Sequence, residues 1–185
     1  VDAMAKKPEF SFTMAHLKDE GMIATSEIAT KIADFTYSKY MRDTRQALKD
    51  FDDGKDSMLI DDMVNMNIML TGMVSDLSTG GKQLAVAHNF YDAVCCMYKD
   101  VRRKYLHGEI VAMALPLQLA VNGRPEAEIE ELKAFLREVG IPVSIREAGV
   151  PQDGLEELIT YVHRVTIPDD MELLEQIRDG FKYIM

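Results

Sequence analysis

The chain has 185 residues, which is long enough to bury a sizeable hydrophobic core without a disulfide or a structural metal, and one domain is the expectation. Its 47% hydrophobic and 28% charged residues lie in the range of globular proteins and argue against a disordered chain. The formal net charge of -10 would repel a phosphate backbone, so we expect no nucleic acid partner. We interpret the thirteen methionines as flexible filler of a helical core rather than as a binding surface.

The two cysteines are neighbours in the sequence, Cys95 and Cys96, inside a helical pattern. Adjacent residues cannot bridge each other without distorting the backbone, which favours a reducing, cytoplasmic setting. The longest uncharged stretch, Ile110 to Gly123, is too short to cross a bilayer, and no signal-like segment opens the chain. We therefore expect no membrane partner.

The first half of the chain predicts two helical regions joined by an acidic turn. Apolar side chains recur at roughly helical intervals from Glu20 to Asp50, which predicts one or two helices. Residues 52–56 form the turn, and Ser57 can cap a second helical region from Met58 to about Leu77. This second region is apolar nearly all round, so we expect it at the centre of the fold.

The acidic turn does not match a calcium-binding EF-hand loop. With Gly54 at the sixth position of that pattern, Lys49 would occupy the first ligand position and Phe51 the third. Neither side chain coordinates calcium, so we exclude this site.

The second half predicts a series of amphipathic helices. We expect helices from Leu84 to Tyr98 and from His107 to Val121, with a short connection at Arg102 to Tyr105 between them. Pro116 lies inside the second helix and should bend its axis, because proline removes one backbone hydrogen bond.

Three further helices complete the predicted fold. The first follows Pro125 and ends just before Gly140, with proline at its first turn and glycine past its end. The others run from Leu155 to about Val165 and from Asp170 to about Tyr183. No segment reads as part of a β-sheet, so the predicted fold class is all-α: a multihelical bundle, with residues 1–185 as a single helical domain.

Two of the four histidines are candidate metal ligands. His88 and His107 fall on separate predicted helices, and neutral imidazole nitrogens are good ligands for a divalent metal. Gly108 follows the second histidine and permits close approach of another group. A lone histidine on an apolar helix is more often a hydrogen-bonded core residue, and sequence spacing alone does not show that the two meet.

Several segments resemble one known family. Those around the histidines are Gly80–Asn89, His107–Met113 and Leu117–Leu119. Those downstream are Glu128–Leu132, Val139–Val143 and Ala148–Val150, and those upstream are Val1-Asp2, Pro8 and Glu20–Met22. Together they resemble the C-terminal helical domain of glycerol dehydrogenases, in the iron-containing alcohol dehydrogenase superfamily with its dehydroquinate synthase-like fold.

The resemblance implies a metal-dependent oxidoreductase. In that family an N-terminal α/β domain binds NAD, and the helical domain holds zinc or iron through one Asp and two His. The metal polarises the substrate hydroxyl so that hydride can pass to the nicotinamide. By the resemblance His88 and His107 stand at the two histidine positions, and this chain is the helical domain without the NAD-binding domain.

The third ligand position departs from the family. The family's Asp follows the Gly-Met pair closely, but matching without a gap places Ala24 there and a two-residue gap places Ser26 there. Glu27 lies one helical turn beyond Ala24 and is our candidate replacement, against the alternative that it is an ordinary surface residue. A site with two imidazoles alone would bind zinc much more weakly.

Other positions around the histidines also differ or carry weaker expectations. Phe90 replaces a common Gly and should place a bulky ring beside the site, and Ala85 replaces a further histidine. Asp92 can orient His88 as an acceptor or can be a solvated helix acid. We interpret His16 and His163 as ordinary surface or boundary residues.

Two functions from different classes follow. The first is the metal- and substrate-binding domain of a glycerol-dehydrogenase-like NAD-dependent oxidoreductase acting on a small polyol or alcohol. Because the chain carries no dinucleotide fingerprint, it should be inactive unless a partner chain supplies the NAD site. The second is a degenerate non-catalytic helical domain that serves oligomerisation or protein interaction. A helical domain separated from its neighbour exposes an apolar interface, so we expect a homo-oligomer.

Overall fold

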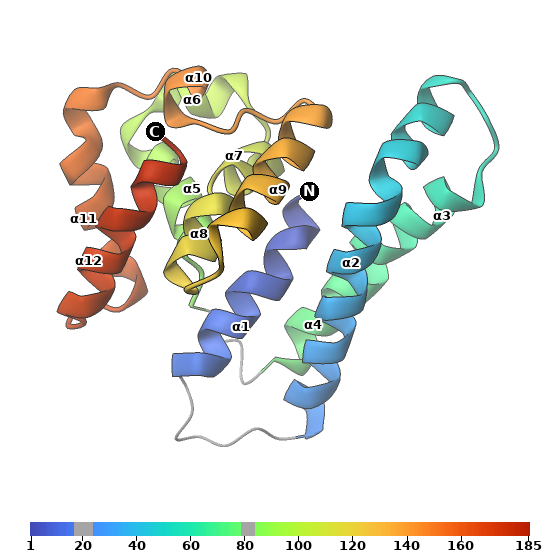
Figure 1. The fold of residues 1–185 in the computed structure, drawn as a ribbon, viewed down its shortest axis with the longest axis horizontal. Coiled ribbons are helices and arrows are strands. Elements are labelled where there is room, and N and C mark those ends of the chain that lie inside the picture. Colours follow the sequence, from blue (N-terminus) through green and yellow to red (C-terminus); the bar gives the residue numbers. More distant parts are fainter. Residues whose placement is uncertain (17–23, 79–83) are drawn as a thin grey trace. The chain divides into compact units, whose positions relative to one another are not determined.

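A computed structural model describes residues 1–16, 24–78 and 84–185, and every regular element in these ranges is a helix (Figure 1). The all-α prediction is therefore confirmed for the described residues. None of the described helices is both long enough and apolar enough to cross a membrane.

The chain divides into two compact units. The N-terminal unit comprises Val1 and Ala3–Gln83, and the C-terminal unit comprises Asp2 and Leu84–Met185. The single domain of residues 1–185 stays a prediction, and the two units are described separately below.

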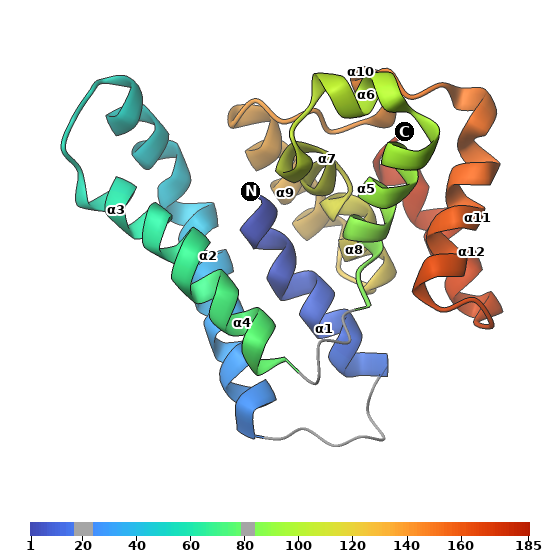
Figure 2. The same cartoon turned by 180° about the vertical axis from the view of Figure 1, so that it is seen from behind.

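The N-terminal unit is built around a helical hairpin. Its elements are η1 (Asp2–Ala5), apart from Asp2, which belongs to the C-terminal unit, and α1 (Lys6–His16), α2 (Ala24–Asp52), α3 (Met58–Asn65), the π-helical η3 (Met66–Leu70) and α4 (Thr71–Leu77). The long α2 packs along α3 and α4 (Figure 2), and α1 packs against α2 and α4. Phe10, Ala29, Ala33 and Val74 form a buried cluster where these helices meet. Small alanines on α2 allow the close approach, and Phe10 is the largest of the buried side chains in the cluster.

The predicted helical region from Met58 to Leu77 is confirmed, but its central position is wrong. It is one continuous helical path of α3, η3 and α4, and Ser57 caps it by accepting a hydrogen bond from the amide of Leu59. No residue of α3 is buried, although α3 packs against α2. The methionine interpretation is therefore wrong for Met58 and Met69, which are exposed, although Met66 is buried.

The C-terminal unit packs a larger set of shorter helices. They are α5 (Val86–Met97), α6 (Lys99–Lys104), α7 (His107–Met113), α8 (Leu115–Val121), α9 (Glu126–Glu138), α10 (Ile145–Ala148), η5 (Gln152–Gly154), α11 (Leu155–Thr166), α12 (Met171–Gly180) and η6 (Phe181–Tyr183). α5 contacts α6, α7, α8 and α11, and α8 contacts α9 and α12. The apolar α8 and the fully buried rings of Phe90, Phe135 and Phe181 lie in this core. α5 is thus packed from several sides, which fixes the helix that carries His88.

Two predicted elements of this unit differ from the structure. The connection at Arg102 to Tyr105 is largely helix α6, which has Asp100 in its first turn and basic residues in its last, as the helix dipole favours. The single helix from His107 to Val121 is two helices, α7 and α8, because the backbone turns at Ala114 and Pro116 occupies the first turn of α8. Proline starts a helix here rather than bending one.

The remaining helix boundaries of this unit agree with the sequence-based expectations. Gly140 follows α9 with a φ of +79°, a left-handed conformation that glycine adopts without strain. Asp170 caps α12 by accepting a hydrogen bond of 2.9 Å from the amide of Leu173.

Candidate metal centre

His88 and His107 face each other between two packed helices. His88 is the third residue of α5 and His107 is the first residue of α7, and the centroids of their rings are 5.4 Å apart. Asp2 joins them: its Oδ1 lies 3.5 Å from Nε2 of His88 and 3.6 Å from Nε2 of His107. The three side chains offer ligand atoms within 4.8 Å of one another.

The first turn of α5 is anchored on both sides of His88. The amide of Ala87 donates a hydrogen bond of 3.2 Å to Oε1 of Gln118, a fully buried residue of α8. The side-chain amide of Asn89 donates one of 2.7 Å to Oγ1 of Thr166 at the end of α11. These bonds fix the backbone that carries the imidazole of His88.

Gly108 and the cap formed by Glu109 position the other two candidate ligands, Asp2 and His107. A Cβ at Gly108 would lie 2.9 Å from Cβ of Asp2, closer than real Cβ atoms come, so only glycine admits Asp2 here. The expectation that Gly108 permits a close approach is confirmed. The amide of Leu106 donates a hydrogen bond of 2.7 Å to Oε2 of Glu109, which holds the start of α7 and so the backbone of His107.

The electrostatics favour an ionised Asp2. Its contact with His88 lowers the pKa of Asp2 most, the charges of His88 and His107 lower it further, and burial opposes them. Both nitrogen contacts are too long for good hydrogen bonds. Oδ1 is buried and accepts no hydrogen bond from any described residue, which is an unusual state for a carboxylate oxygen.

The donor set fits a zinc or iron ion. Nitrogen and oxygen ligands about 2.0–2.1 Å from a tetrahedral zinc lie about 3.3 Å apart, close to the observed oxygen–nitrogen separations. A metal would also satisfy the orphaned Oδ1 of Asp2. The side chains of His88 and His107 are 30% and 42% exposed, so one side of the group is open to a further ligand. Three protein ligands and an open position are typical of catalytic rather than structural sites.

The bulky ring beside the histidines is not the one expected. Phe90 is fully buried, and its ring lies 6.2 Å from that of Phe181, so the expectation that Phe90 crowds the site is wrong. One residue further along α5, Tyr91 turns towards α7, and its ring centroid is 4.2 Å from that of His107. The helical turn of about 100° between adjacent residues separates the two aromatic side chains.

Among the described residues, the group of possible metal ligands does not include the other sequence candidates. Glu27 and Ala24 are exposed on α2 of the N-terminal unit, and Ser26 is buried there with its hydroxyl unpaired among the described residues. Asp92 is an exposed residue of α5. Among the described residues, the three-residue metal-competent group contains Asp2 and not Glu27.

The two remaining histidines make ordinary hydrogen bonds. His16 is exposed and its Nδ1 lies 2.8 Å from the carbonyl oxygen of Phe12, one turn earlier in α1. His163 is buried, and its Nε2 lies 2.7 Å from the carbonyl oxygen of Asp170. The interpretation of His163 as a surface or boundary residue is therefore wrong: it is a core residue that helps join α11 to the start of α12.

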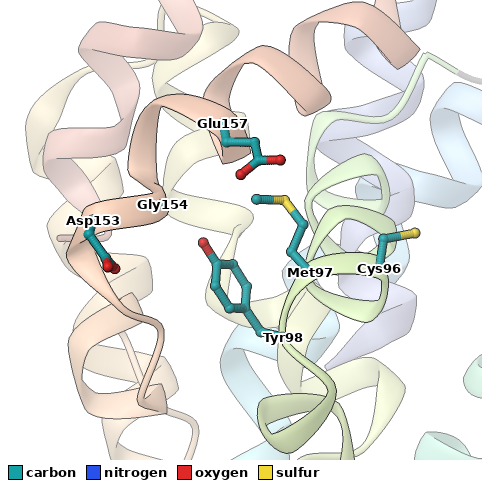
Figure 3. A pocket seen from close by; sticks show the side chains of 6 residues that line it. All are labelled: Cys96, Met97, Tyr98, Asp153, Gly154 and Glu157. Carbon is teal, nitrogen blue, oxygen red and sulfur yellow. The ribbon is translucent and has the colours of Figure 1, made fainter.

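A separate polar cavity of about 440 Å³ opens at the junction of α5, η5 and α11. Its lining residues are Cys96, Met97, Tyr98, Asp153, Gly154 and Glu157 (Figure 3). The hydroxyl of Tyr98 is buried with no hydrogen-bond partner among the described residues, and burial, followed by the charges of Glu157 and Asp153, raises the pKa of Tyr98. A lining with carboxylates and no cation is unsuited to a pyrophosphate group, so this cavity does not resemble a dinucleotide site.

Comparisons with known proteins point to one family. No family model matches the sequence. The chain is 33% identical to the glycerol dehydrogenase of Thermotoga maritima over 82 residues, which are 44% of this chain and 21% of that protein. The shared segment is thus a small part of that relative.

Solved structures show the same fold over nearly the whole chain. A probable glycerol dehydrogenase from Sinorhizobium meliloti superposes with a TM-score of 0.71 at 21% identity, covering 98% of this chain and 53% of that one. The glycerol dehydrogenase of Schizosaccharomyces pombe gives 0.67 at 20% identity, covering 84% and 41%. This chain therefore spans about half the length of these structures or less.

The fold of the chain is therefore the all-helical fold found over about half the length of these glycerol dehydrogenase structures, and the predicted all-α fold class agrees with it. Over the 82 matched residues the chain is similar in sequence to a glycerol dehydrogenase, and its fold fits a domain of about half the length of such enzymes, as the resemblance predicted.

Proposed function

We propose that this chain is the metal- and substrate-binding domain of a glycerol-dehydrogenase-like NAD-dependent oxidoreductase. The observation that carries the proposal is the convergence of Asp2, His88 and His107: Oδ1 of Asp2 lies 3.5 and 3.6 Å from the two imidazole nitrogens and accepts no hydrogen bond from a described residue. Asp2 would replace the carboxylate that is missing at Ala24 and Ser26, and would return the negative charge that a zinc or iron site needs.

Each ligand has a defined task in this proposal. His88 and His107 would hold the ion through neutral imidazoles, and Asp2 would balance part of its charge. The bound ion would supply Lewis-acid polarisation of a hydroxyl of a small polyol or alcohol. The solvent-exposed edges of the two histidines leave room for that hydroxyl beside the ligands.

The nicotinamide cofactor would be held by a different domain or partner chain. The described residues contain no β-strand and hence no strand–turn–helix unit of the kind that binds a dinucleotide. The chain alone should therefore not turn over substrate. In a cytoplasmic setting, which the free thiols Cys95 and Cys96 suit, such a partner would also meet NAD.

Metal analysis of the purified chain tests the proposal. We expect about one zinc or iron ion per chain, and we expect His88→Ala, His107→Ala and Asp2→Asn to lower metal affinity at least about tenfold. Glu27→Gln tests the ligand predicted from sequence, and His16→Ala is the matched histidine control. Both should bind metal like the unaltered chain. Full metal binding by His88→Ala and His107→Ala, or loss in Glu27→Gln, would contradict the assignment.

Turnover tests the cofactor half of the proposal. The chain mixed with a folded NAD-binding domain of a glycerol dehydrogenase should gain NAD-dependent oxidation of glycerol or a related polyol, and His107→Ala in the same mixture should not. No activity with a partner that demonstrably binds NAD would count against a catalytic role.

A non-catalytic role in oligomerisation or protein interaction is the second candidate, favoured by the apolar surface of the N-terminal unit. Its exposed large apolar side chains are Ile28, Phe35, Leu48, Phe51, Met58, Val64, Ile68, Met69 and Met73. Clustered apolar side chains on a surface commonly mark an interaction site. A metal-free chain that self-associates in light scattering, and becomes monomeric on Phe51→Glu with Ile68→Glu, would favour this candidate over the first.

A further inference from the structure

The ring of Tyr91 packs directly against His107. The two rings meet edge to face, with an interplanar angle of 71° and centroids 4.2 Å apart. Tyr91 lies three residues after His88 on α5, so both side chains leave the same face of that helix. α5 therefore presents one ligand and one aromatic ring to the same imidazole of α7.

Tyr91 is itself held from two directions. The guanidinium of Arg102 on α6 lies over the Tyr91 ring, with Cζ 5.7 Å from the ring centroid. The phenol also interacts with the thiol of Cys95, one turn further along α5. Three helices, α5, α6 and α7, thus contribute the contacting side chains Tyr91, Arg102 and His107, and α5 packs on both of the others.

The orientation of His107 needs such support. The last side-chain torsion of histidine has a broad energy minimum, so an unrestrained imidazole does not keep its nitrogen in one direction. The His107 side chain is 42% exposed, and its described contacts are those with Asp2, His88 and Tyr91. Of these, Asp2 and His88 are the proposed co-ligands, which leaves Tyr91 as the contact that orients the ring independently of a metal.

We propose that Tyr91, braced by Arg102, is a positioning residue that holds the imidazole of His107 with its Nε2 aimed at Asp2 and His88. The expected effect of this positioning is tighter metal binding, so this part of the inference rests on the proposed metal function. The ring of Tyr91, and not its hydroxyl, carries the effect, because the contact with His107 is between ring faces and edges.

The chain contains a matched control at Tyr161. This tyrosine of α11 hydrogen-bonds with the thiol of Cys96, and the guanidinium of Arg164 lies over its ring at 5.6 Å. It reproduces the thiol and guanidinium partners of Tyr91, but none of the contacts described for it involves a histidine. Tyr161→Ala therefore removes an equivalent ring without touching the metal group.

Metal competition with a chromophoric chelator measures the consequence. We expect Tyr91→Ala to raise the zinc dissociation constant about 10- to 100-fold, the range typical of residues that orient a ligand. Tyr91→Phe should remain within about twofold of the unaltered chain, since it keeps the ring. Tyr161→Ala should leave the constant unchanged. Unaltered zinc affinity in a folded Tyr91→Ala chain, or a loss in Tyr91→Phe as large as in Tyr91→Ala, would overturn the inference.

Two spectroscopic readouts separate this inference from simple misfolding and from failure of the proposed function. Cobalt in place of zinc should give an altered visible absorption spectrum in Tyr91→Ala but not in Tyr161→Ala or Tyr91→Phe. In the metal-free protein, the ring-proton NMR shifts of His107 should carry the ring current of Tyr91. These His107 shifts should change in Tyr91→Ala and stay the same in Tyr91→Phe, even if the chain binds no metal. Unmoved His107 shifts in Tyr91→Ala would refute the contact itself.

Discussion

At the scale of single residues, the candidate centre depends on a missing side chain as much as on the ligands. Gly108 stands where a Cβ would lie 2.9 Å from Cβ of Asp2, and 3.5 Å from its backbone nitrogen. Neither atom is the flexible end of a side chain, so an added methyl group must displace Asp2 rather than be accommodated. A carboxylate that moves by a fraction of an ångström no longer bridges the two imidazoles.

We predict that Gly108→Ala weakens zinc binding about tenfold or more while leaving the fold intact, because it shifts Asp2 away from His88 and His107. Chelator competition followed by thermal unfolding measures both effects. The control is Gly72→Ala on α4, where nothing lies within 4 Å of the added Cβ. Equal zinc affinity in Gly108→Ala and Gly72→Ala would show that Asp2 is not a ligand.

At a second glycine, Gly154 in the polar cavity of Figure 3, an added Cβ would also come too close to a neighbouring side chain. A Cβ at Gly154 would meet the Tyr98 hydroxyl, which is buried and unpaired among the described residues. We predict that Gly154→Ala destabilises the C-terminal unit and that Tyr98→Phe alone stabilises it by about 1 kcal/mol, since an unsatisfied hydroxyl leaves the interior. Urea unfolding of the two single variants and of the double variant measures the coupling free energy between Gly154 and Tyr98. The double variant should lose less stability than the sum of the single effects, and strict additivity would contradict the contact.

At the scale of helices, charged side chains tie α2 to α3 in the N-terminal unit. Nζ of Lys39 lies 2.6 Å from a carboxylate oxygen of Asp62 on α3 and 3.3 Å from one of Asp43 on α2. Asp43 also accepts two hydrogen bonds from Arg42, of 2.7 and 2.8 Å. The Arg42 hydrogen bonds and the Lys39 ammonium lower the pKa of Asp43 from 3.8 to about 2.

This shift gives stability a defined dependence on pH. Because the pKa of Asp43 is lower in the folded chain, its ion pairs stabilise the fold fully above about pH 4 and lose their effect as the pH falls towards about 2. Arg42 is largely exposed, so we expect Asp43→Asn to reduce the free energy of unfolding at pH 7 by only about 1 kcal/mol or less. Unfolding curves of both proteins from pH 7 to pH 2 measure the difference. A gap that stays constant or widens on acidification would contradict this assignment.

Helix boundaries show where sequence patterns suffice. The caps at Ser57 and Asp170 and the glycine after α9 act through neighbouring backbone groups, so local sequence predicted them. The break between α7 and α8 was missed, because a proline inside an apolar run fits either a bent helix or the start of a new one. The exposure of α3 was missed for another reason: an apolar pattern records what a helix could bury, not how many neighbours cover it.

At the scale of the whole molecule, the all-helical class and the two candidate histidines were predictable from the sequence, but the proposed third ligand, Asp2, was not. Helical periodicity acts within a few residues, and the motifs around His88 and His107 carry the family resemblance. Asp2 reaches the site only because Gly108 admits it, and no spacing rule links the start of the chain to α7. Likewise, Phe90 and Tyr91 are adjacent in sequence, but Phe90 packs against Phe181 and Tyr91 against His107. Tertiary packing decides which of the two rings lies beside the histidines.

X-ray absorption spectroscopy of the zinc-loaded chain measures most directly which atoms bind the metal. We predict a shell of nitrogen and oxygen ligands at about 2.0–2.1 Å with the outer-shell scattering of two imidazoles, reduced to one imidazole in His107→Ala. Asp2→Asn should change the first shell while keeping both imidazoles. Sulfur scattering at about 2.3 Å, from Cys95 or Cys96, or a zinc spectrum without imidazole, would contradict a centre built from Asp2, His88 and His107.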